Sequence, residues 1–390
     1  MQGEREMSPE EIAFSRLPSV LVEEMVRKSR EVGESLAQSL GEIHQRRNEF
    51  REELERKGLL EHESSLGVAV PPTTCAVDGA YVVERLLSVD LTAMSAVALE
   101  GLTPPREERY WERPYHSFFM WVEPHHVDTP RVLRAVMLGN EVRLAAKAPH
   151  RLVFLDGSLA LLVIYFTQVF LRAPAIQDLD CSKTFFRECC DYLRDYLTIL
   201  YAERTDRQFA GVVKYTVRRE IAKMMRQLPN CDDRGILTLI LKAGELTRPQ
   251  PLEHDRRWNL DVSLLPQDLR RQIRDLVGEV IERVQEVHVF YYRPYEWLPV
   301  FRVEVPGPVA GNRYRLLTVI QGIKHQCVTG AMKEPYPLHF ADMIAKDSMS
   351  CLPVVRQVII QEVMKRYKGS LGEVFFALHS YRSEGGGVDL

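Results

Sequence analysis

Two apolar segments of this chain end on the same pair of residues, Asp-Gly. The stretch "TTCAVDGAYVV" places Asp78 after small apolar residues, and "RLVFLDGSLALLVIYF" places Asp156 after a second apolar run that resumes almost at once. A carboxylate between two hydrophobic segments is costly to bury unless a partner compensates its charge. The identity of that partner constrains the fold more than any other feature of the sequence.

The spacing of apolar residues around the two aspartates predicts several strands followed by a helix, and then a further strand and helix. "CAVDG" predicts a short strand that ends in a turn, "AYVVERLLSVDLTAMSAVALEG" predicts two further strands, and "HSFFMWVEP" predicts another. "DTPRVLRAVMLGNEVRLAAKA" predicts a helix with Asp128 as its cap and Pro130 in its first turn. "HRLVFLDG" is then expected as a buried strand, and "SLALLVIYFTQVFL" as the helix after it.

This order of elements is the layout of an RNase H-like nuclease core, an α/β fold with a mixed sheet flanked by helices. In that layout Asp78 and Asp156 lie at the ends of neighbouring strands, and Glu141 leans toward them from the intervening helix. Converging carboxylates cannot all stay ionised without a cation, and two hard divalent ions satisfy them. Two metals about 3.5–4 Å apart activate a water and stabilise the leaving oxygen of a phosphodiester.

Each of these residues alone has a plainer interpretation. Asp-Gly at a strand end is often only turn chemistry, and Glu141 alone is typical of a surface helix. In this order, with hydrophobic strands leading into both aspartates, the three together favour a metal site.

The flanking regions predict an arm before the core and a tail after it. Residues 1–69 are expected as an N-terminal helical arm for dimerisation or partner contact, because apolar residues recur at helical spacing from Leu21 to Leu40. The nuclease domain is expected over residues 70–350, and residues 351–390 as a C-terminal helical segment with a flexible tail.

Within the domain, a mostly helical insertion is expected at about residues 176–285. It includes the basic segment "KYTVRREIAKMMRQL", interpreted as a helix, and one short strand at "FAGVVKY", while "GELTRPQPLEHDRRWNL" is interpreted as a loop. Farther on, "EVHVFYYRPY" and "LPVFRVEVPGPV" alternate like paired strands, and "PYPLHFADMIAKDSM" predicts a helix that starts just after Pro337.

Composition excludes several classes of protein. The seven cysteines are odd in number and form no CxxC pair, so neither a disulfide framework nor a zinc site is indicated. The acidic start lacks a hydrophobic signal core and no apolar segment is long enough to span a bilayer, so a soluble, cytoplasmic protein is expected. The net charge of −3 argues mildly against nucleic acid as a partner, and each basic cluster alone is typical of a solvated helix face.

Several blocks together resemble the NurA family. They are "AVDGAY" at 76–81, Glu141 ahead of "DGSL" at 156–159, "GVVKYT" at 211–216, "FRVEVPG" at 301–307 and "YPLHFAD" at 336–342. The resemblance runs from about residue 70 to 350. It implies a manganese-dependent nuclease that works with the hexameric DNA translocase HerA in DNA end resection.

The resemblance also implies roles for single residues. Asp78, Glu141 and Asp156 would be metal ligands. Lys214 matches the lysine of a Gly-x-x-Lys block and would contact a phosphate, although a plain strand-end lysine is an equal alternative. Tyr336 matches an aromatic ahead of the last helix, where it would orient substrate or cap the core.

One departure from the family pattern concerns the C-terminal helix. Where the family has Ala-His, this sequence has Ala341-Asp342. RNase H-like sites commonly take a fourth carboxylate from a late helix, so Asp342 is a candidate ligand of a second metal. His339, one helical turn earlier, is the alternative. The segment "PPREERYWERPYHSFFMWVEPHH" is long for the family and is interpreted as a contact surface.

The expected function is therefore a DNA nuclease that uses Mn²⁺ or Mg²⁺, with two ions in each site. Its expected partners are DNA, a HerA-like hexameric ATPase and a second copy of the chain, in DNA repair or in phage defence. The alternative is a catalytically weak nuclease-fold subunit of a translocase complex. An actin-like ATPase would need Gly-rich phosphate loops and a serine hydrolase would need G-x-S-x-G; the sequence has neither.

Overall fold

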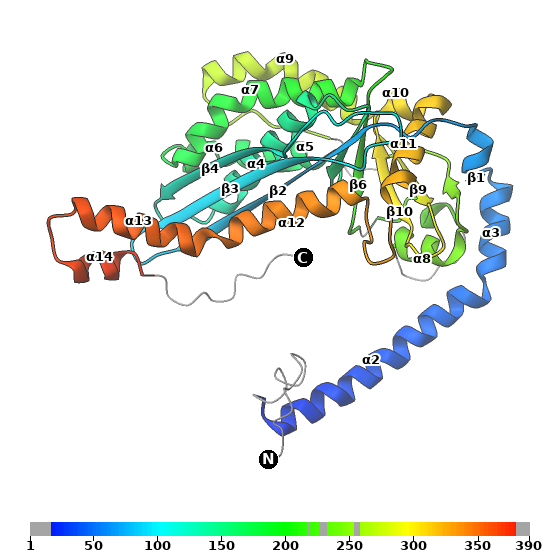
Figure 1. Cartoon of the computed structure of the whole chain (residues 1–390), viewed down its shortest axis with the longest axis horizontal. Helices are drawn as coiled ribbons and strands as arrows, with labels where there is room; N and C mark the ends of the chain where they lie inside the picture. The colour runs from blue at the N-terminus through cyan, green and yellow to red at the C-terminus, as the bar shows by residue number, and fades with distance from the viewer. Residues whose placement is uncertain (1–16, 217, 226–231, 253–257, 380–390) are drawn as a thin grey trace.

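The structure is a computed structural model that describes residues 17–216, 218–225, 232–252 and 258–379 (Figure 1). Its central feature is one mixed sheet of ten strands. The strands are β1 (Leu60–His62), β2 (Thr74–Arg85), β3 (Asp90–Glu100), β4 (Tyr115–Glu123), β5 (Leu152–Asp156), β6 (Gln208–Val213), β7 (Glu245–Thr247), β8 (Gln250–Pro251), β9 (His288–Arg293) and β10 (Phe301–Val305).

Helices surround this sheet and extend from both ends of the described chain. They are α2 (Ser19–Gln45), α3 (Arg47–Arg56), α4 (Thr129–Lys147), α5 (Leu161–Phe170), α6 (Ala173–Ile176), α7 (Asp180–Tyr201), α8 (Asp233–Ile240), α9 (Gln267–Val284), α10 (Gly307–Ala310), α11 (Arg313–Gln326), α12 (Tyr336–Ser350), α13 (Leu352–Arg366) and α14 (Leu371–Ala377). Two short 3₁₀ turns, η1 (Glu63–Leu66) and η2 (Ala222–Met224), complete the secondary structure.

The strand order confirms the predicted α/β class with an RNase H-like core. The order is β1-β7-β9-β10-β6-β5-β2-β3-β4, and β8 pairs with β9. Within it, β2, β3 and β4 form an antiparallel meander, while β5 pairs parallel to both β2 and β6. Residues Leu152–Leu155 of β5 are all buried, as expected for a parallel strand covered on both faces.

Two helices cover opposite faces of β2 and β3 (Figure 1). On one face lies α4, which connects β4 to β5 and packs in turn on α7. On the other face lies α12, which is fixed to β3 by a hydrogen bond of 2.7 Å between the Ser95 and Ser348 hydroxyls. The sheet therefore brings side chains from two distant helices to the same strands.

One strand is longer than the sequence predicted. The segment "CAVDG" was expected to end in a turn, but β2 continues without a break from Thr74 to Arg85, so Asp78 lies inside it. The glycine that suggested a turn has a packing role instead. A side chain at Gly79 would lie 2.5 Å from Glu141 Oε1 and 3.0 Å from the Ser95 carbonyl oxygen.

The helix expected over "KYTVRREIAKMMRQL" is wrong in the part that the structure describes. Only the three-residue turn η2 occurs there, and residues 217 and 226–231 lie outside the described residues. Glu220 is buried and accepts a hydrogen bond from Arg302, while the backbone amides of Ile221 and Ala222 donate to Asp233. These long-range contacts replace the local bonds of a helix.

The segment from 244 to 260 was expected to be a loop, yet it contributes β7, which lies between β1 and β9, and β8, which pairs with β9. Residues 253–257 of that segment lie outside the described residues. Strand β6 of the expected helical insertion likewise lies between β5 and β10 in the sheet. The domain boundaries themselves stay a prediction.

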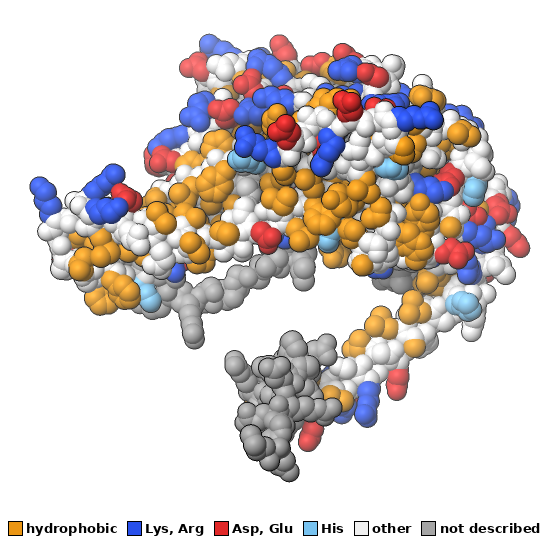
Figure 2. All heavy atoms as spheres, in the orientation of Figure 1, with side chains coloured by type: hydrophobic (Ala, Val, Ile, Leu, Met, Phe, Trp, Pro, Cys, Tyr) orange, Lys and Arg blue, Asp and Glu red, His pale blue; other side chains and the backbone are white. Residues whose placement is uncertain are grey.

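Outside the domain, α2 extends away from the body, and α13 and α14 follow α12 at the opposite end (Figure 1). Most apolar residues of α2 are exposed, for example Val32 and Leu36, whereas Ile43 near its end is buried. Hydrophobic side chains are visible along α2 and around α12 in Figure 2. Residues 1–16 of the expected arm and 380–390 of the expected tail lie outside the described residues. No helix in the described ranges is long and apolar enough to cross a membrane.

Candidate metal centre

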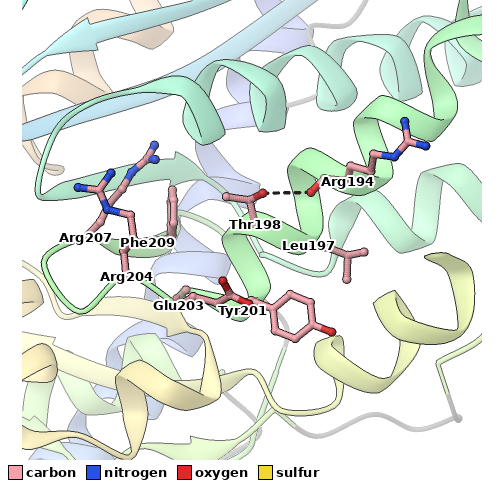
Figure 3. Close-up of a pocket in the computed structure, with 9 residues that line it drawn as sticks. Arg194, Leu197, Thr198, Tyr201, Glu203, Arg204, Arg207 and Phe209 are labelled. Atoms are coloured by element: carbon pink, nitrogen blue, oxygen red, sulfur yellow. Dashed lines mark hydrogen bonds between the residues drawn. The ribbon is translucent and has the colours of Figure 1, made fainter. Parts of the chain in front are cut away.

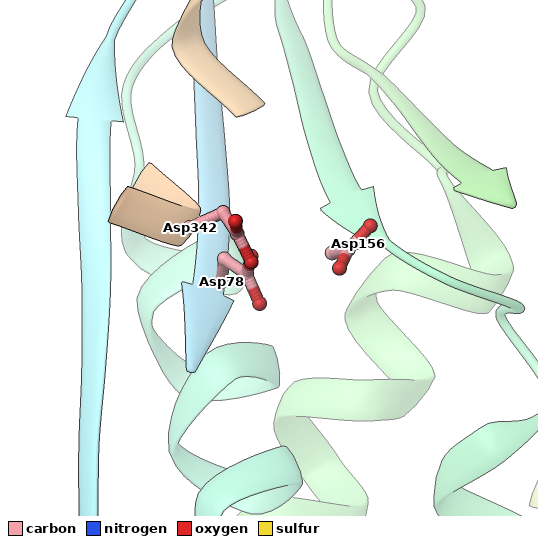
Figure 4. A group of neighbouring side chains, drawn as sticks. All are labelled: Asp78, Asp156 and Asp342. Atoms are coloured by element: carbon pink, nitrogen blue, oxygen red, sulfur yellow. The ribbon is translucent and has the colours of Figure 1, made fainter. Parts of the chain in front are cut away.

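Three aspartates from three separate elements meet at one place (Figure 4). Asp78 comes from β2, Asp156 from the end of β5, and Asp342 from α12. One carboxylate oxygen of each lies within 4.8 Å of the corresponding oxygen of the other two. Asp78 is buried, whereas Asp156 and Asp342 are partly exposed, so the cluster is open on one side.

Sheet register brings the first two together. Val77 of β2 pairs with Leu155 of β5 in the parallel ladder, so the next residue on each strand is an aspartate. Strand β5 ends at Asp156, whereas β2 continues past Asp78 to Arg85. Because side chains alternate along a strand, Asp78 faces α12 and Gly79 faces α4.

The turn after β5 is held by a buried carboxylate. Gly157 has a φ of +84°, a left-handed conformation that favours glycine. Glu304, on the buried strand β10, accepts hydrogen bonds from the Ser158 hydroxyl at 2.7 Å and from the Leu159 amide at 2.9 Å. Arg302 pairs with the same carboxylate. The direction in which Asp156 leaves β5 is thus fixed from the neighbouring strands.

Glu141 lies beside the cluster on the opposite face of β2. Its Oε1 occupies the space that a side chain at Gly79 would need, which places the carboxylate against the backbone next to Asp78. The side chain is buried, with 4% of its surface exposed. The cluster of three aspartates that lie within 4.8 Å of one another does not include it.

The carboxylates raise one another's pKa. Burial, and then the charges of Asp156 and Glu141, raise the pKa of Asp78 well above its ordinary value. Burial, and then Asp156, raise the pKa of Glu141 to about 8. Without a cation these groups therefore resist ionisation at neutral pH, and a bound cation would relieve the repulsion.

Lys214, which follows β6, contacts several of the carboxylates. Its Nζ lies 3.4 Å from Asp156 Oδ2, 3.0 Å from Glu334 Oε2 and 3.8 Å from Asp342 Oδ1. Burial opposes its charge, but Asp156, Glu334 and the other two aspartates outweigh burial and raise the pKa of Lys214. The lysine is thus fully charged at the edge of the cluster.

Glu334 was missed by sequence reasoning. It precedes α12 by two residues and lies between Lys214 and His339, whose Nδ1 is 3.3 Å from Glu334 Oε1. The signal was present, because "EPYPLHFAD" holds a second carboxylate in the block that carries Asp342. The remaining candidate, Tyr336, begins α12, and its ring packs 4.7 Å from that of Phe340.

The donor set fits a hard divalent cation. Asp78 Oδ2 and Asp156 Oδ1 are buried oxygens without a hydrogen-bond partner, a costly state unless a cation binds them. All the clustered donors are carboxylate oxygens, which Mg²⁺ and Mn²⁺ prefer. His339, in contrast, contacts Glu334 and is not among the clustered ligands.

A separate pocket lies at the opposite end of β6 (Figure 3). It has a volume of about 390 Å³ and is lined by residues at the end of α7 and the start of β6, including Tyr201, Arg207 and Phe209. Arg207 donates to the carbonyl oxygens of Ala145 and Ala146, which ties it to the end of α4. The pocket therefore lies at the start of β6, whereas Asp156 and Lys214 lie near the end of β6, and it is not part of the carboxylate cluster.

Comparisons with known proteins give one family. Residues 72–347 match the NurA domain family, and no curated protein matches the sequence. The crystal structure of the NurA nuclease from Sulfolobus solfataricus has a TM-score of 0.52 at 14% identity, covering 87% of this chain and 99% of that one. A second crystal structure of NurA has a TM-score of 0.51 at 12% identity, covering 88% of this chain and 98% of its own. These two structures share the fold of this chain.

Proposed function

Because this chain belongs to the NurA family, whose domain spans residues 72–347, we propose that it is a divalent-metal-dependent deoxyribonuclease. The observation that carries the proposal is the meeting of Asp78, Asp156 and Asp342 within 4.8 Å, with buried oxygens that lack partners. A site that has lost its activity has no need to keep such mutually repelling carboxylates together. The proposed reaction is hydrolysis of a phosphodiester bond in DNA.

The three aspartates would hold the metal, Mn²⁺ or Mg²⁺, with Glu141 close enough to act on a second ion or on its water shell. Divalent ions at such a site supply Lewis acidity for the scissile phosphate and an activated water. The arrangement is proposed to hold two ions. Asp342 takes the place that the family pattern gives to a histidine.

The surrounding side chains would bind and orient the substrate. Lys214 presents its ammonium group 3.4 Å from Asp156 Oδ2, where it can contact a non-bridging phosphate oxygen. Glu334 holds that ammonium group from the other side at 3.0 Å. Arg234 donates to the Lys214 carbonyl oxygen and to that of Val300, which fixes the backbone at this position.

The same resemblance supports a proposal about partners. A HerA-like hexameric ATPase would deliver DNA to the nuclease in end processing for repair or in phage defence. The exposed apolar residues of α2 support a homodimer, because apolar stripes of this length are usually covered in the working assembly. In such a dimer, basic residues need only line a shared channel for a net-negative protein to bind DNA.

A cleavage assay tests the proposed activity. The purified chain is incubated with end-labelled single-stranded DNA and Mn²⁺, with and without excess EDTA, and the products are separated by gel electrophoresis. We expect cleavage that EDTA abolishes and that Mn²⁺ in excess over EDTA restores. Cleavage that persists in EDTA would contradict the metal site. Absence of cleavage with Mn²⁺ and with Mg²⁺, both for the chain alone and with a HerA-like ATPase, would contradict the activity.

A further inference from the structure

Glu334 gives the Lys214 ammonium group its shortest ion-pair contact. The distance from Lys214 Nζ is 3.0 Å to Glu334 Oε2, compared with 3.4 Å to Asp156 Oδ2 and 3.8 Å to Asp342 Oδ1. Both aspartates belong to the cluster that could hold a metal ion, whereas Glu334 does not. Of these three carboxylates, Glu334 is therefore the one that stays available to the lysine when a cation occupies the cluster.

An occupied metal site would change the forces on the lysine. With a divalent ion bound, the charges of Asp156 and Asp342 are compensated, and the ammonium group is repelled by the ion. The side chain of a lysine is a flexible four-carbon stem, which turns toward solvent unless an anion holds its end. Glu334 is placed to be that anion.

Glu334 is itself held in place and depends on the lysine for its charge. Its side chain is 14% exposed, and its Oε2 is buried without a hydrogen bond, so the ammonium group of Lys214 compensates its charge. The other oxygen, Oε1, lies 3.3 Å from His339 Nδ1. Because Glu334 directly precedes Pro335, the cap residue of α12, one helix carries Asp342 and begins beside this carboxylate.

The backbone of Lys214 is fixed as well. Strand β6, which ends at Val213, is buried along its whole length. Arg234 donates to the carbonyl oxygen of Lys214 and, at 2.9 Å, to that of Val300. With its main chain held at one end and its ammonium group at the other, the long side chain keeps one geometry. A contact with a reacting phosphate requires such fixed geometry.

A purely structural role for Glu334 is the alternative, in which the carboxylate ties the start of α12 to the end of β6. The helix has other anchors, however, because Ser348 bonds to Ser95 at 2.7 Å and Leu338 and Ala341 are buried. A structural role would also act whether or not a cation is bound. The two interpretations therefore predict different results.

We propose that Glu334 is a positioning residue, which holds the Lys214 ammonium group against the substrate phosphate when a divalent ion occupies the aspartates. The inference rests on the proposed function and adds a residue to its site. Removal of a negative charge near bound DNA ordinarily strengthens DNA binding. Loss of the Glu334 charge should instead weaken DNA binding, because the ammonium group is no longer held at the phosphate.

A comparison of DNA affinity with and without a cation tests the proposal and does not require hydrolysis. Binding of fluorescein-labelled oligothymidine is measured by fluorescence anisotropy in Ca²⁺, a hard ion that carboxylates bind, and separately in EDTA. The proteins are the wild type, Glu334→Gln, Lys214→Met and the double variant. Loss of one charge-assisted contact corresponds to about ten- to a hundred-fold weaker binding.

In Ca²⁺ we expect that loss in Glu334→Gln and in Lys214→Met, and no further loss in the double variant, because Glu334 acts through Lys214. In EDTA, Asp156 and Asp342 also hold the ammonium group. There we expect Glu334→Gln to bind as the wild type does. Thermal unfolding in EDTA should give equal midpoints for Glu334→Gln and the wild type.

The matched control is Glu362→Gln, which neutralises a glutamate on α13 that lies 2.6 Å from Lys365 Nζ. It should bind DNA as the wild type does in both buffers. Unchanged or stronger binding by Glu334→Gln in Ca²⁺ would overturn the proposal. Equal losses in Ca²⁺ and EDTA, losses that add in the double variant, or a lower unfolding midpoint would show a structural role and overturn it as well.

The two levels of the proposal fail separately. If Glu334→Gln binds normally while the wild type cleaves DNA with Mn²⁺, the positioning role is wrong and the nuclease activity stands. If the losses in Ca²⁺ appear as expected while no metal supports cleavage, the positioning role stands and the activity is wrong. A wild-type protein that binds no oligothymidine in Ca²⁺ would contradict the positioning role.

Discussion

Asp78→Ala and Asp156→Ala are each expected to abolish DNA cleavage while leaving the protein folded. Each removes a carboxylate from a cluster whose three members lie within 4.8 Å of one another. The loss of one ligand takes away several kcal/mol of transition-state stabilisation that the metal supplies, a fall of about a thousandfold or more in rate. Initial rates of cleavage of a labelled single strand with Mn²⁺ measure the effect.

Folding of both variants is checked by thermal unfolding in EDTA. We expect midpoints equal to or above that of the wild type, because burial and the neighbouring carboxylates raise the pKa of Asp78, so the ionised cluster costs stability. Asp347→Ala, which removes an exposed aspartate from α12, is the matched control and should cleave normally. Normal cleavage by either variant, or unfolding of both, would contradict the metal-site assignment.

Asp342→Ala is expected to have the second largest effect, about a hundredfold in rate, or ~3 kcal/mol. The carboxylate lies 3.8 Å from Lys214 Nζ and 2.9 Å from Lys346 Nζ. Although burial acts in the other direction, these two lysines lower the pKa of Asp342, so it is ionised and ready to bind a cation. Because the other two aspartates remain, raising the Mn²⁺ concentration should restore part of the activity.

Two further substitutions on α12 test its register. Asp342→His should keep activity with Mn²⁺ and lose activity with Mg²⁺, since an imidazole suits borderline metals better than hard ones. His339→Ala should be mild, because His339 contacts Glu334 rather than the three clustered aspartates. A severe loss in His339→Ala together with normal rates in Asp342→Ala would show that the histidine completes the site.

The core elements were predictable because their signals are local. The buried strand β5 is a continuous apolar run, and α4 has Pro130 in its first turn. The segments expected as paired strands near the C-terminus form β9 and β10, which pair antiparallel. The order of strands and helices then implied the RNase H-like layout, which the strand order confirms.

The errors in the fold come from contacts between residues far apart in sequence. Gly79 has the sequence signature of a turn, but β2 passes straight through it because it pairs with β3 on both sides of the glycine. Glu141 Oε1 fills the space that a side chain at Gly79 would need. The basic segment after Lys214 has a helical pattern, yet Glu220 is bound by Arg302 from β10. No local pattern carries that information.

Local sequence signals predicted only part of the site. Asp78 and Asp156 follow apolar strands, and parallel register brings them together. The position of Glu141 on the other face of β2, and the place of Glu334 between Lys214 and His339, depend on helix packing that the sequence does not encode locally. The roles of all these residues stay predictions until variants are measured.

Direct titration of metal tests the central claim. The metal-free protein is titrated with Mn²⁺ in an isothermal calorimeter, in parallel with Asp156→Asn, which keeps the size of the side chain and removes its charge. The three aspartates predict saturable binding to the wild type that is weakened at least about tenfold in the variant, a loss of ~1.4 kcal/mol. Equal binding by both proteins, or no binding by the wild type, would contradict a metal centre formed by Asp78, Asp156 and Asp342.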